Sequence, residues 1–138
     1  MNNTNGIIIT EVDERRISRL LERKAGELDA RALELLEDEL TAAKVVSSKE
    51  VPPGVVTMNS VVLFEDVETG QRHEVTLVYP DEGAGALGRV SILAPIGGAL
   101  LGLSVGSSIE WPVPGGRARR VRVIEVKYQP EAFGQLET

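Results

Sequence analysis

The chain divides at one stretch, Ser47-Ser48-Lys49-Glu50-Val51-Pro52-Pro53-Gly54, and this division decides the fold. Two adjacent prolines and a glycine cannot continue a helix, because proline lacks an amide proton and clashes with the preceding turn. Before this connector, residues 10–46 are rich in Leu, Ala, Glu and Arg, whereas from Val55 onward Val, Thr, Gly and Pro predominate. We therefore expect a helical unit over residues 1–50 and a sheet-forming unit over residues 51–138.

The helical unit has the pattern of a short antiparallel hairpin. Asp13 is expected as the N-cap of its first helix, followed by a buried stripe, and Gly26 is expected to end that helix. Asp29 repeats the capping device, and apolar residues then follow at coiled-coil spacings of three and four: Leu33, Leu36, Leu40 and Ala43. The arms are predicted to be about 11 and 16 residues, so about 17 and 24 Å long at 1.5 Å per residue.

The second unit is predicted to contain five strands and one short helix. The strands are expected at residues 60–67, 72–79, 90–93, 109–113 and 117–129. Pro95 suits the first turn of the helix. The alternation in the last strand changes phase near Val123, which indicates a β-bulge. One helix packed on a mostly antiparallel sheet is an α+β arrangement.

The composition excludes several kinds of site. The chain has no cysteine, so disulfides, zinc–thiolate sites and thiol nucleophiles are excluded. Its single histidine, His73, has no second histidine or cysteine with which to bind a metal, and no nucleophile-elbow motif is present. A net charge of −6 argues against nucleic-acid binding as the main activity. We expect no enzymatic activity, no metal and no cofactor.

The sequence also lacks the patterns of membrane proteins. The first ten residues do not combine a basic start with a long apolar run, so they do not resemble a signal peptide. No apolar stretch is long enough to span a bilayer. We expect a cytoplasmic protein.

Several segments of the chain form a distinctive set. They are Val55-Val56-Thr57-Met58-Asn59-Ser60-Val61-Val62-Leu63-Phe64, Thr76-Leu77-Val78-Tyr79-Pro80, Val90-Ser91-Ile92-Leu93-Ala94-Pro95-Ile96-Gly97-Gly98-Ala99-Leu100-Leu101-Gly102, Pro114-Gly115-Gly116 and the ending that runs from Val123 to Ala132. Together these segments resemble the Gre transcription factor family. Met58-Asn59-Ser60 and Tyr128-Gln129-Pro130 are similar to the Rnk branch, the regulators of nucleoside diphosphate kinase.

The resemblance implies both a fold and a function. Family members pair an N-terminal coiled coil with an FKBP-like C-terminal domain, which docks at the rim of the RNA polymerase secondary channel. In Gre factors a long coiled coil enters the channel, and acidic residues at its tip help to hold a metal for transcript cleavage. The hairpin of this chain is short, and its turn does not match that acidic tip. We therefore expect a monomeric, non-catalytic regulator that binds RNA polymerase and competes with Gre factors.

Two other functions remain open. The first is a transcript-cleavage factor of the Gre type, and the second is a prolyl isomerase or chaperone-like module. The aromatic residues Phe64, Tyr79, Trp111, Tyr128 and Phe133 are too few and too scattered in the sequence to predict an isomerase pocket.

Two groups of residues are candidate sites. By resemblance, the start of the short helix faces the polymerase, which assigns partner binding to Ala94, Pro95, Ile96, Gly97 and Leu100. Ile96 is either an exposed docking residue or part of the core, and the sequence favours neither. The hairpin tip carries Arg23, Lys24, Glu27 and Asp29, with Glu22 nearby. Its carboxylates could assist metal binding, but helix capping explains them better and the two cations oppose a second cation.

Three further motifs have simple structural explanations. The acidic run Glu34, Glu37, Asp38 and Glu39 is expected to be the solvated face of a helix. The glycines between residues 97 and 102 are expected to allow close packing of the helix rather than to bind phosphate. The arginines of the last strand, Arg117, Arg119, Arg120 and Arg122, are expected mainly to protect a sheet edge, although contact with polymerase or RNA phosphates remains an alternative.

Overall fold

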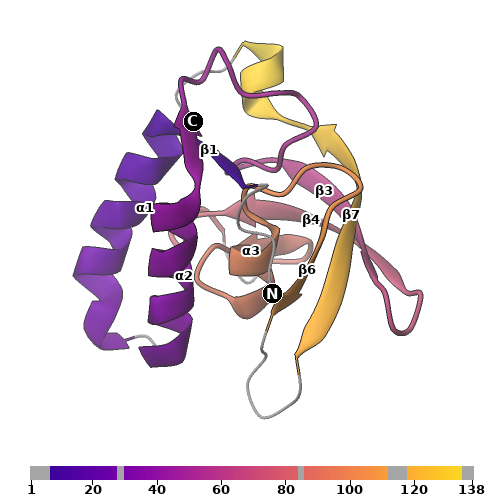
Figure 1. The fold of residues 1–138 in the computed structure, drawn as a ribbon, viewed down its shortest axis with the longest axis horizontal. Helices are drawn as coiled ribbons and strands as arrows, with labels where there is room; N and C mark the ends of the chain where they lie inside the picture. The colour runs from indigo at the N-terminus through magenta and orange to yellow at the C-terminus, as the bar shows by residue number, and fades with distance from the viewer. Residues whose placement is uncertain (1–6, 28–29, 84–85, 112–117, 135–138) are drawn as a thin grey trace.

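The computed structural model describes residues 7–27, 30–83, 86–111 and 118–134 (Figure 1). A helical hairpin packs beside a curled sheet, and a short helix, α3, lies between them (Figure 1). The elements of the first half are β1 (Ile8–Thr10), α1 (Glu11–Lys24), η2 (Ala25–Glu27), α2 (Ala30–Ala42) and β2 (Lys44–Val46). Those of the second half are β3 (Val61–Asp66), β4 (Arg72–Val78), β5 (Arg89–Ser91), α3 (Pro95–Leu100), β6 (Ser108–Trp111), β7 (Arg119–Tyr128) and η3 (Pro130–Phe133).

The predicted hairpin is present, but both helices have different ends from those expected. α1 has 14 residues and α2 has 13. α1 begins earlier because Thr10 caps it: its Oγ1 accepts a hydrogen bond from the Asp13 amide at 3.1 Å. The prediction that Asp13 is the N-cap is therefore wrong. The cap predicted at Asp29 lies outside the described residues.

Asp13 joins the hairpin to the sheet instead of capping a helix. Its side chain accepts hydrogen bonds from the Met58 amide at 3.1 Å and from the Tyr79 hydroxyl at 3.2 Å. The residue is almost completely buried, and this burial raises the pKa of its carboxyl group above the usual value. A buried carboxylate is stable only where donors surround it, so Asp13 fixes α1 against the end of β4.

A small parallel sheet that the sequence did not predict holds both ends of the hairpin. β1 pairs with β2 in the register Ile8↔Lys44, Ile9↔Val45 and Thr10↔Val46. The second helix was predicted to have about 16 residues, but α2 has 13 and ends at Ala42, because the chain turns into β2. The Ile8 amide also donates to the carbonyl of Gly102 at 3.1 Å. The hairpin is therefore attached to the sheet unit at its start and at its end.

The main sheet confirms the five predicted strands. Its order is β5-β4-β3-β7-β6, and all pairs are antiparallel except β4 with β5. The predicted bulge is also present: Leu63 pairs with Glu125 and Phe64 pairs with Val123, so that Ile124 is skipped. The bulge changes the phase of β7, as the alternation of the sequence indicated.

One hydrophobic core crosses the boundary expected near residue 50. Ile17, Leu20 and Leu36 of the hairpin belong to the same buried cluster as Leu100 of α3 and Val123 of β7. α3 connects the two parts, because a Cβ added at Gly98 would lie 3.3 Å from Leu36 and 3.1 Å from Trp111. The hairpin thus packs as a layer of the fold on the outer side of α3.

Candidate functional site

The start of α3 reaches the surface of the protein. Ala94, Pro95 and Ile96 are all partly exposed. Pro95 occupies the first turn, and the N-cap Ala94 has no side-chain cap. Ile96 is neither fully exposed nor fully part of the core. Its side chain packs against the core cluster but is only half-buried.

The other two candidates on α3 do not reach the surface. Leu100 is completely buried in the core. Gly97 is buried as well, and a Cβ at this position would lie only 2.1 Å from the carbonyl oxygen of Ser91. Gly97 therefore allows α3 to touch the end of β5, which confirms the expectation that these glycines serve close packing.

A cavity of about 340 Å³ lies beside Ile96, and we call it the apolar groove. Its lining consists mostly of apolar and aromatic side chains: Phe64, Asp66, His73, Val75, Val90, Ile96, Trp111, Arg119 and Val121. The rings of Phe64 and His73 are 5.4 Å apart, on the neighbouring strands β3 and β4. Phe64 and Trp111 thus share one cavity, although their separation in the sequence suggested scattered aromatics.

The two charged side chains of the apolar groove, Asp66 and Arg119, neutralise each other. Arg119 of β7 forms an ion pair with Asp66 at the end of β3. Asp66 also accepts a hydrogen bond from the Glu68 amide at 3.0 Å, within the turn after β3. These bonds occupy the Asp66 carboxylate in the fold, so the groove offers an apolar rather than a charged surface to a partner.

The arginines of β7 have a different role from the one predicted. β7 lies between β3 and β6, so it is not an edge strand. The prediction that its arginines protect a sheet edge is therefore wrong. Each described arginine of the strip instead faces a carboxylate on a neighbouring strand: Arg119 with Asp66, Arg120 with Glu110 at 3.1 Å, and Arg122 with Glu65 at 3.9 Å. Arg117 lies outside the described residues.

The hairpin tip is exposed and contains an ion pair. Lys24 lies 3.5 Å from Glu27, while Arg23 and Glu27 are exposed to solvent. Asp29 lies outside the described residues. Among the residues that the structure describes, no three His, Cys, Asp or Glu side chains are grouped so that they could hold a metal ion.

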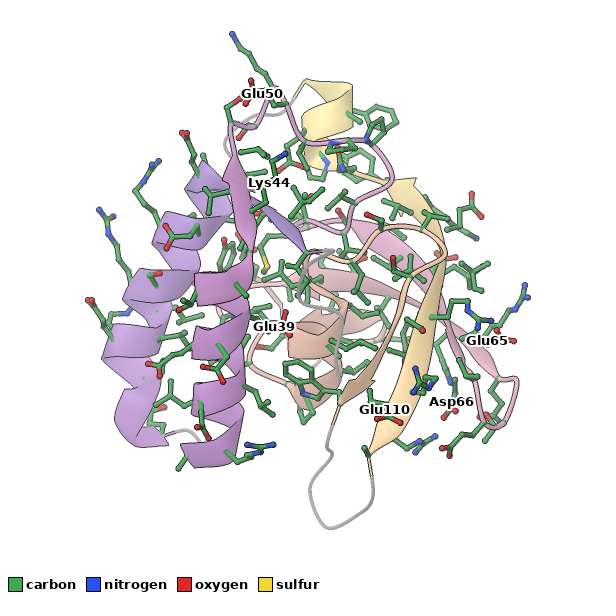
Figure 2. All side chains as sticks on the ribbon, viewed as in Figure 1. Glu39, Lys44, Glu50, Glu65, Asp66 and Glu110 are labelled. Atoms are coloured by element: carbon green, nitrogen blue, oxygen red, sulfur yellow. The ribbon has the colours of Figure 1, made fainter. Side chains whose placement is uncertain are left out.

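Glu39 departs from the solvated face that the acidic run predicted. Glu34, Glu37 and Asp38 are exposed, as expected, but Glu39 is 8% exposed. It follows Leu36 by three residues and so shares the inner face of α2, and Figure 2 shows it directed from α2 toward α3. Burial, together with the charge of Asp38, raises the pKa of Glu39 to about 7.

We expect Glu39→Gln to stabilise the protein at alkaline pH. The wild-type carboxyl group favours the folded state below its usual pKa of 4.5, and this contribution is lost as the pH rises through about 7. Gln is always neutral, so the variant should gain up to about 3 kcal/mol near pH 9 and little near pH 5. Thermal unfolding at both pH values measures the difference. Glu37→Gln, on the exposed face, is the control, and an equal gain from it would contradict this explanation.

Comparisons with known proteins agree with this architecture. Residues 51–128 match the family described as transcription elongation factor, GreA/GreB, C-term. The regulator of nucleoside diphosphate kinase of Escherichia coli K12 is 44% identical over 128 residues, which are 93% of each chain. The transcription elongation factor GreA of Chloroherpeton thalassium is 35% identical over 92 residues, which are 67% of this chain and 58% of that protein.

A solved structure extends the likeness to the whole fold. The prokaryotic transcription elongation factor GreA/GreB from Nitrosomonas europaea is 45% identical, with a TM-score of 0.71 over 88% of this chain and 99% of that one. No helix in the four described ranges has both the length and the apolar character needed to cross a membrane. The family match, the sequence identity and the shared arrangement of hairpin and sheet lead to one conclusion: the chain belongs to the GreA/GreB family of transcription elongation factors.

Proposed function

We propose that the protein binds RNA polymerase near its secondary channel and regulates transcription without catalysing a reaction. Family membership supports polymerase as the partner. The observation that carries the proposal is the surface formed by Ala94, Pro95, Ile96 and the apolar groove, which we call the docking surface. Through this activity the protein affects the level of nucleoside diphosphate kinase, as the name of its Escherichia coli relative suggests.

The docking surface has the chemistry of a protein interface. Ile96 stands at the rim of a concave site that contains two large rings, Phe64 and Trp111. An apolar anchor beside an aromatic pocket is the arrangement that concentrates binding energy in interfaces. The FKBP-like character inferred from the resemblance fits a short helix over a curled sheet with a groove between them. A polymerase element that presents apolar side chains would fill this groove.

The hairpin supports a role without catalysis. Metal-assisted hydrolysis of RNA requires carboxylates at the polymerase active centre, held to within about half an ångström of the productive geometry. Helices of 14 and 13 residues are only about 21 and 20 Å long. At the described part of the tip, Glu27 is already paired with Lys24. We propose that a monomer in the cytoplasm occupies the entrance of the channel and excludes longer factors.

Transcript cleavage in a backtracked elongation complex tests this proposal. We expect the protein alone to release no short RNA, because its hairpin does not bring carboxylates to the active centre. Added to a Gre factor, it should slow cleavage in a dose-dependent way, since both compete for one docking site. The rate of RNA release, measured over a range of protein concentrations, gives the answer.

The same assay tests the alternative that the protein is itself a transcript-cleavage factor. Strong cleavage by the protein alone, lost in Glu27→Ala, would show that the tip acts on the polymerase active centre. Glu22→Ala, which removes another exposed carboxylate from the end of α1, is the matched control. Undiminished Gre cleavage at saturating protein would contradict a shared docking site.

One observation favours a second candidate, a prolyl isomerase or chaperone-like module. Phe64 and Trp111 line one apolar cavity, and prolyl isomerases bind proline in such aromatic pockets. A proline-containing test peptide would be isomerised faster in the presence of the protein, and Trp111→Ala would remove the effect. If isomerisation of the peptide is not accelerated even at high protein concentration, the isomerase candidate is wrong and only the docking role of the apolar groove remains.

A further inference from the structure

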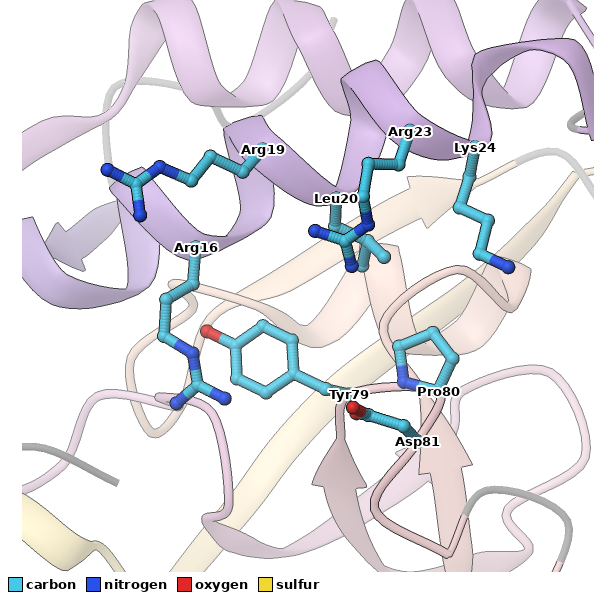
Figure 3. Close-up of a pocket in the computed structure, with 8 residues that line it drawn as sticks. All are labelled: Arg16, Arg19, Leu20, Arg23, Lys24, Tyr79, Pro80 and Asp81. Carbon is cyan, nitrogen blue, oxygen red and sulfur yellow. The ribbon is translucent and has the colours of Figure 1, made fainter.

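A second concave site lies between α1 and the end of β4, and we call it the basic groove (Figure 3). Its cavity of about 570 Å³ is lined by five residues of α1 and three that follow β4: Arg16, Arg19, Leu20, Arg23, Lys24, Tyr79, Pro80 and Asp81. None of these residues belongs to the docking surface. A ligand of the basic groove would therefore be additional to the proposed polymerase contact.

The basic groove gathers four cations on a protein whose net charge is −6. Arg16, Arg19 and Arg23 recur at spacings of three and four residues on one face of α1, and Lys24 follows directly, so the four cations span about 12 Å along the helix. Figure 3 shows the charged ends of Arg16, Arg23 and Lys24 around Tyr79 and Pro80. Like charges repel when they converge in this way, and a bound anion relieves the repulsion.

Two of these cations, Arg19 and Arg23, form no ion pair with another described residue. Within the described part of the chain, no carboxylate lies within ion-pair distance of Arg19 or Arg23. The arginines of β7 differ, because each described one faces a carboxylate. The guanidinium groups of Arg19 and Arg23 are therefore available for bidentate hydrogen bonds to phosphate oxygens.

The floor of the basic groove is apolar and held in place. Leu20 belongs to the core, and the buried Tyr79 hydroxyl donates a hydrogen bond to Asp13 at 3.2 Å. The Arg16 guanidinium lies 4.0 Å from the centre of the Tyr79 ring, where the ring face attracts a cation. A site that is already formed loses little entropy when a ligand binds.

Carboxylates mark both ends of the basic groove. Glu82 lies 3.7 Å from Arg16 at one end, and Glu27 lies 3.5 Å from Lys24 at the other. A long polyanion would have to pass these negative charges, whereas a compact one fits between them. The cavity volume also falls in the range typical of small-ligand sites, about 300–1,000 Å³.

We propose that the basic groove binds a small ligand that carries two or more adjacent phosphates, of the nucleoside polyphosphate class. The phosphates lie against Arg23 and Lys24, whose charged ends Figure 3 shows on the side of Pro80, and the nucleoside covers Leu20 and Pro80. The carboxylate of Asp81, which lines the same cavity, accepts hydrogen bonds from the ribose or from an amino group of the base. The ligand would thus report nucleotide levels on a face separate from the docking surface.

Isothermal titration calorimetry of the full chain tests this site. The probes are pyrophosphate, a nucleoside diphosphate, the matching monophosphate and a short single-stranded RNA. We expect pyrophosphate and the diphosphate to bind, and the monophosphate to bind about tenfold more weakly because it has fewer charged acceptors. Added salt should weaken all of the binding.

Two charge reversals on α1 distinguish binding at the basic groove from a general electrostatic attraction of anions to the helix. Arg23→Glu removes a cation of the basic groove, and Arg15→Glu removes an exposed arginine of α1 that does not line it. Both change the net charge equally. Arg23→Glu should weaken diphosphate binding at least about tenfold, and Arg15→Glu less than about twofold. If Arg23→Glu unfolds at a lower temperature than wild type, Lys24→Glu, which changes the neighbouring cation of the groove, takes its place.

Three results would overturn the proposal. The first is the absence of heat with pyrophosphate and with the diphosphate at millimolar concentration. The second is an equal loss of affinity in Arg15→Glu and Arg23→Glu. The third is tight binding of the RNA that neither small ligand displaces, which would make the basic groove a nucleic-acid surface instead.

Discussion

Gly97→Ala is expected to destabilise the protein by about 3 kcal/mol, the upper part of the range for overpacked sites. The added Cβ would lie 2.1 Å from the Ser91 carbonyl oxygen and 3.2 Å from the Cα of Ile92. Both neighbours are backbone atoms, so the clash can be relieved only if α3 moves away from β5. Thermal unfolding should show a midpoint lower by roughly 10 °C.

Gly26→Ala is the matched control for this change. Gly26 lies in η2 at the hairpin tip, and a Cβ there would meet nothing within 4 Å. It should leave the midpoint unchanged or raise it slightly, since alanine restricts the unfolded chain more than glycine does. A Gly97→Ala variant as stable as wild type would mean that α3 is not held at this distance from the sheet.

Ile96→Asp is expected to weaken binding to RNA polymerase by about 30-fold or more. The carboxylate would have to lose its water when the docking surface is covered, at a cost of about 2 kcal/mol or more. Ile96 is half-buried at the rim of the apolar groove, so the free protein can leave the new charge in water and remain folded. Binding to purified core polymerase, with a thermal unfolding curve of the variant beside it, measures both effects.

Val105→Asp is the control for Ile96→Asp. Val105 is 48% exposed and does not line the apolar groove, so the variant adds the same charge elsewhere on the surface. Its affinity for polymerase should stay within about twofold of wild type, because an exposed charge away from the contact is screened. If Ile96→Asp stays folded and binds as well as wild type, the start of α3 does not dock on polymerase.

Local patterns predicted most of the fold. The Pro-Pro-Gly connector, the strand alternation and Pro95 act within a few residues, so the sequence indicates the elements around them. β1 and β2 escaped prediction because a strand of three residues is too short to show a period. Asp13 was assigned to the wrong role for a related reason: capping is decided locally, whereas its bonds to Met58 and Tyr79 join distant parts of the chain.

The candidate site was predicted only in part. The resemblance assigned partner binding to the start of α3 but left open whether Ile96 is exposed or part of the core. Phe64 and Trp111 come together only because β7 pairs with β3 on one side and with β6 on the other. The i+3 spacing from Leu36 could have shown that Glu39 lies on the inner face of α2, although a run of acidic residues usually marks a solvated face. The basic groove could not be predicted from the sequence, because its cations on α1 lie beside Tyr79 and Pro80, which come from a distant part of the chain.

The pairing of β1 with β2 brings the two ends of the hairpin to one place on the protein. These ends stand side by side in a parallel pair, so the chain leaves the body of the protein and returns to it at one place. Lengthening each helix by seven residues would extend the reach by about 10 Å without disturbing the register of any strand. The fold can therefore carry hairpins of different length beyond one unchanged base, so the reach of the hairpin can evolve independently of the docking surface that we propose.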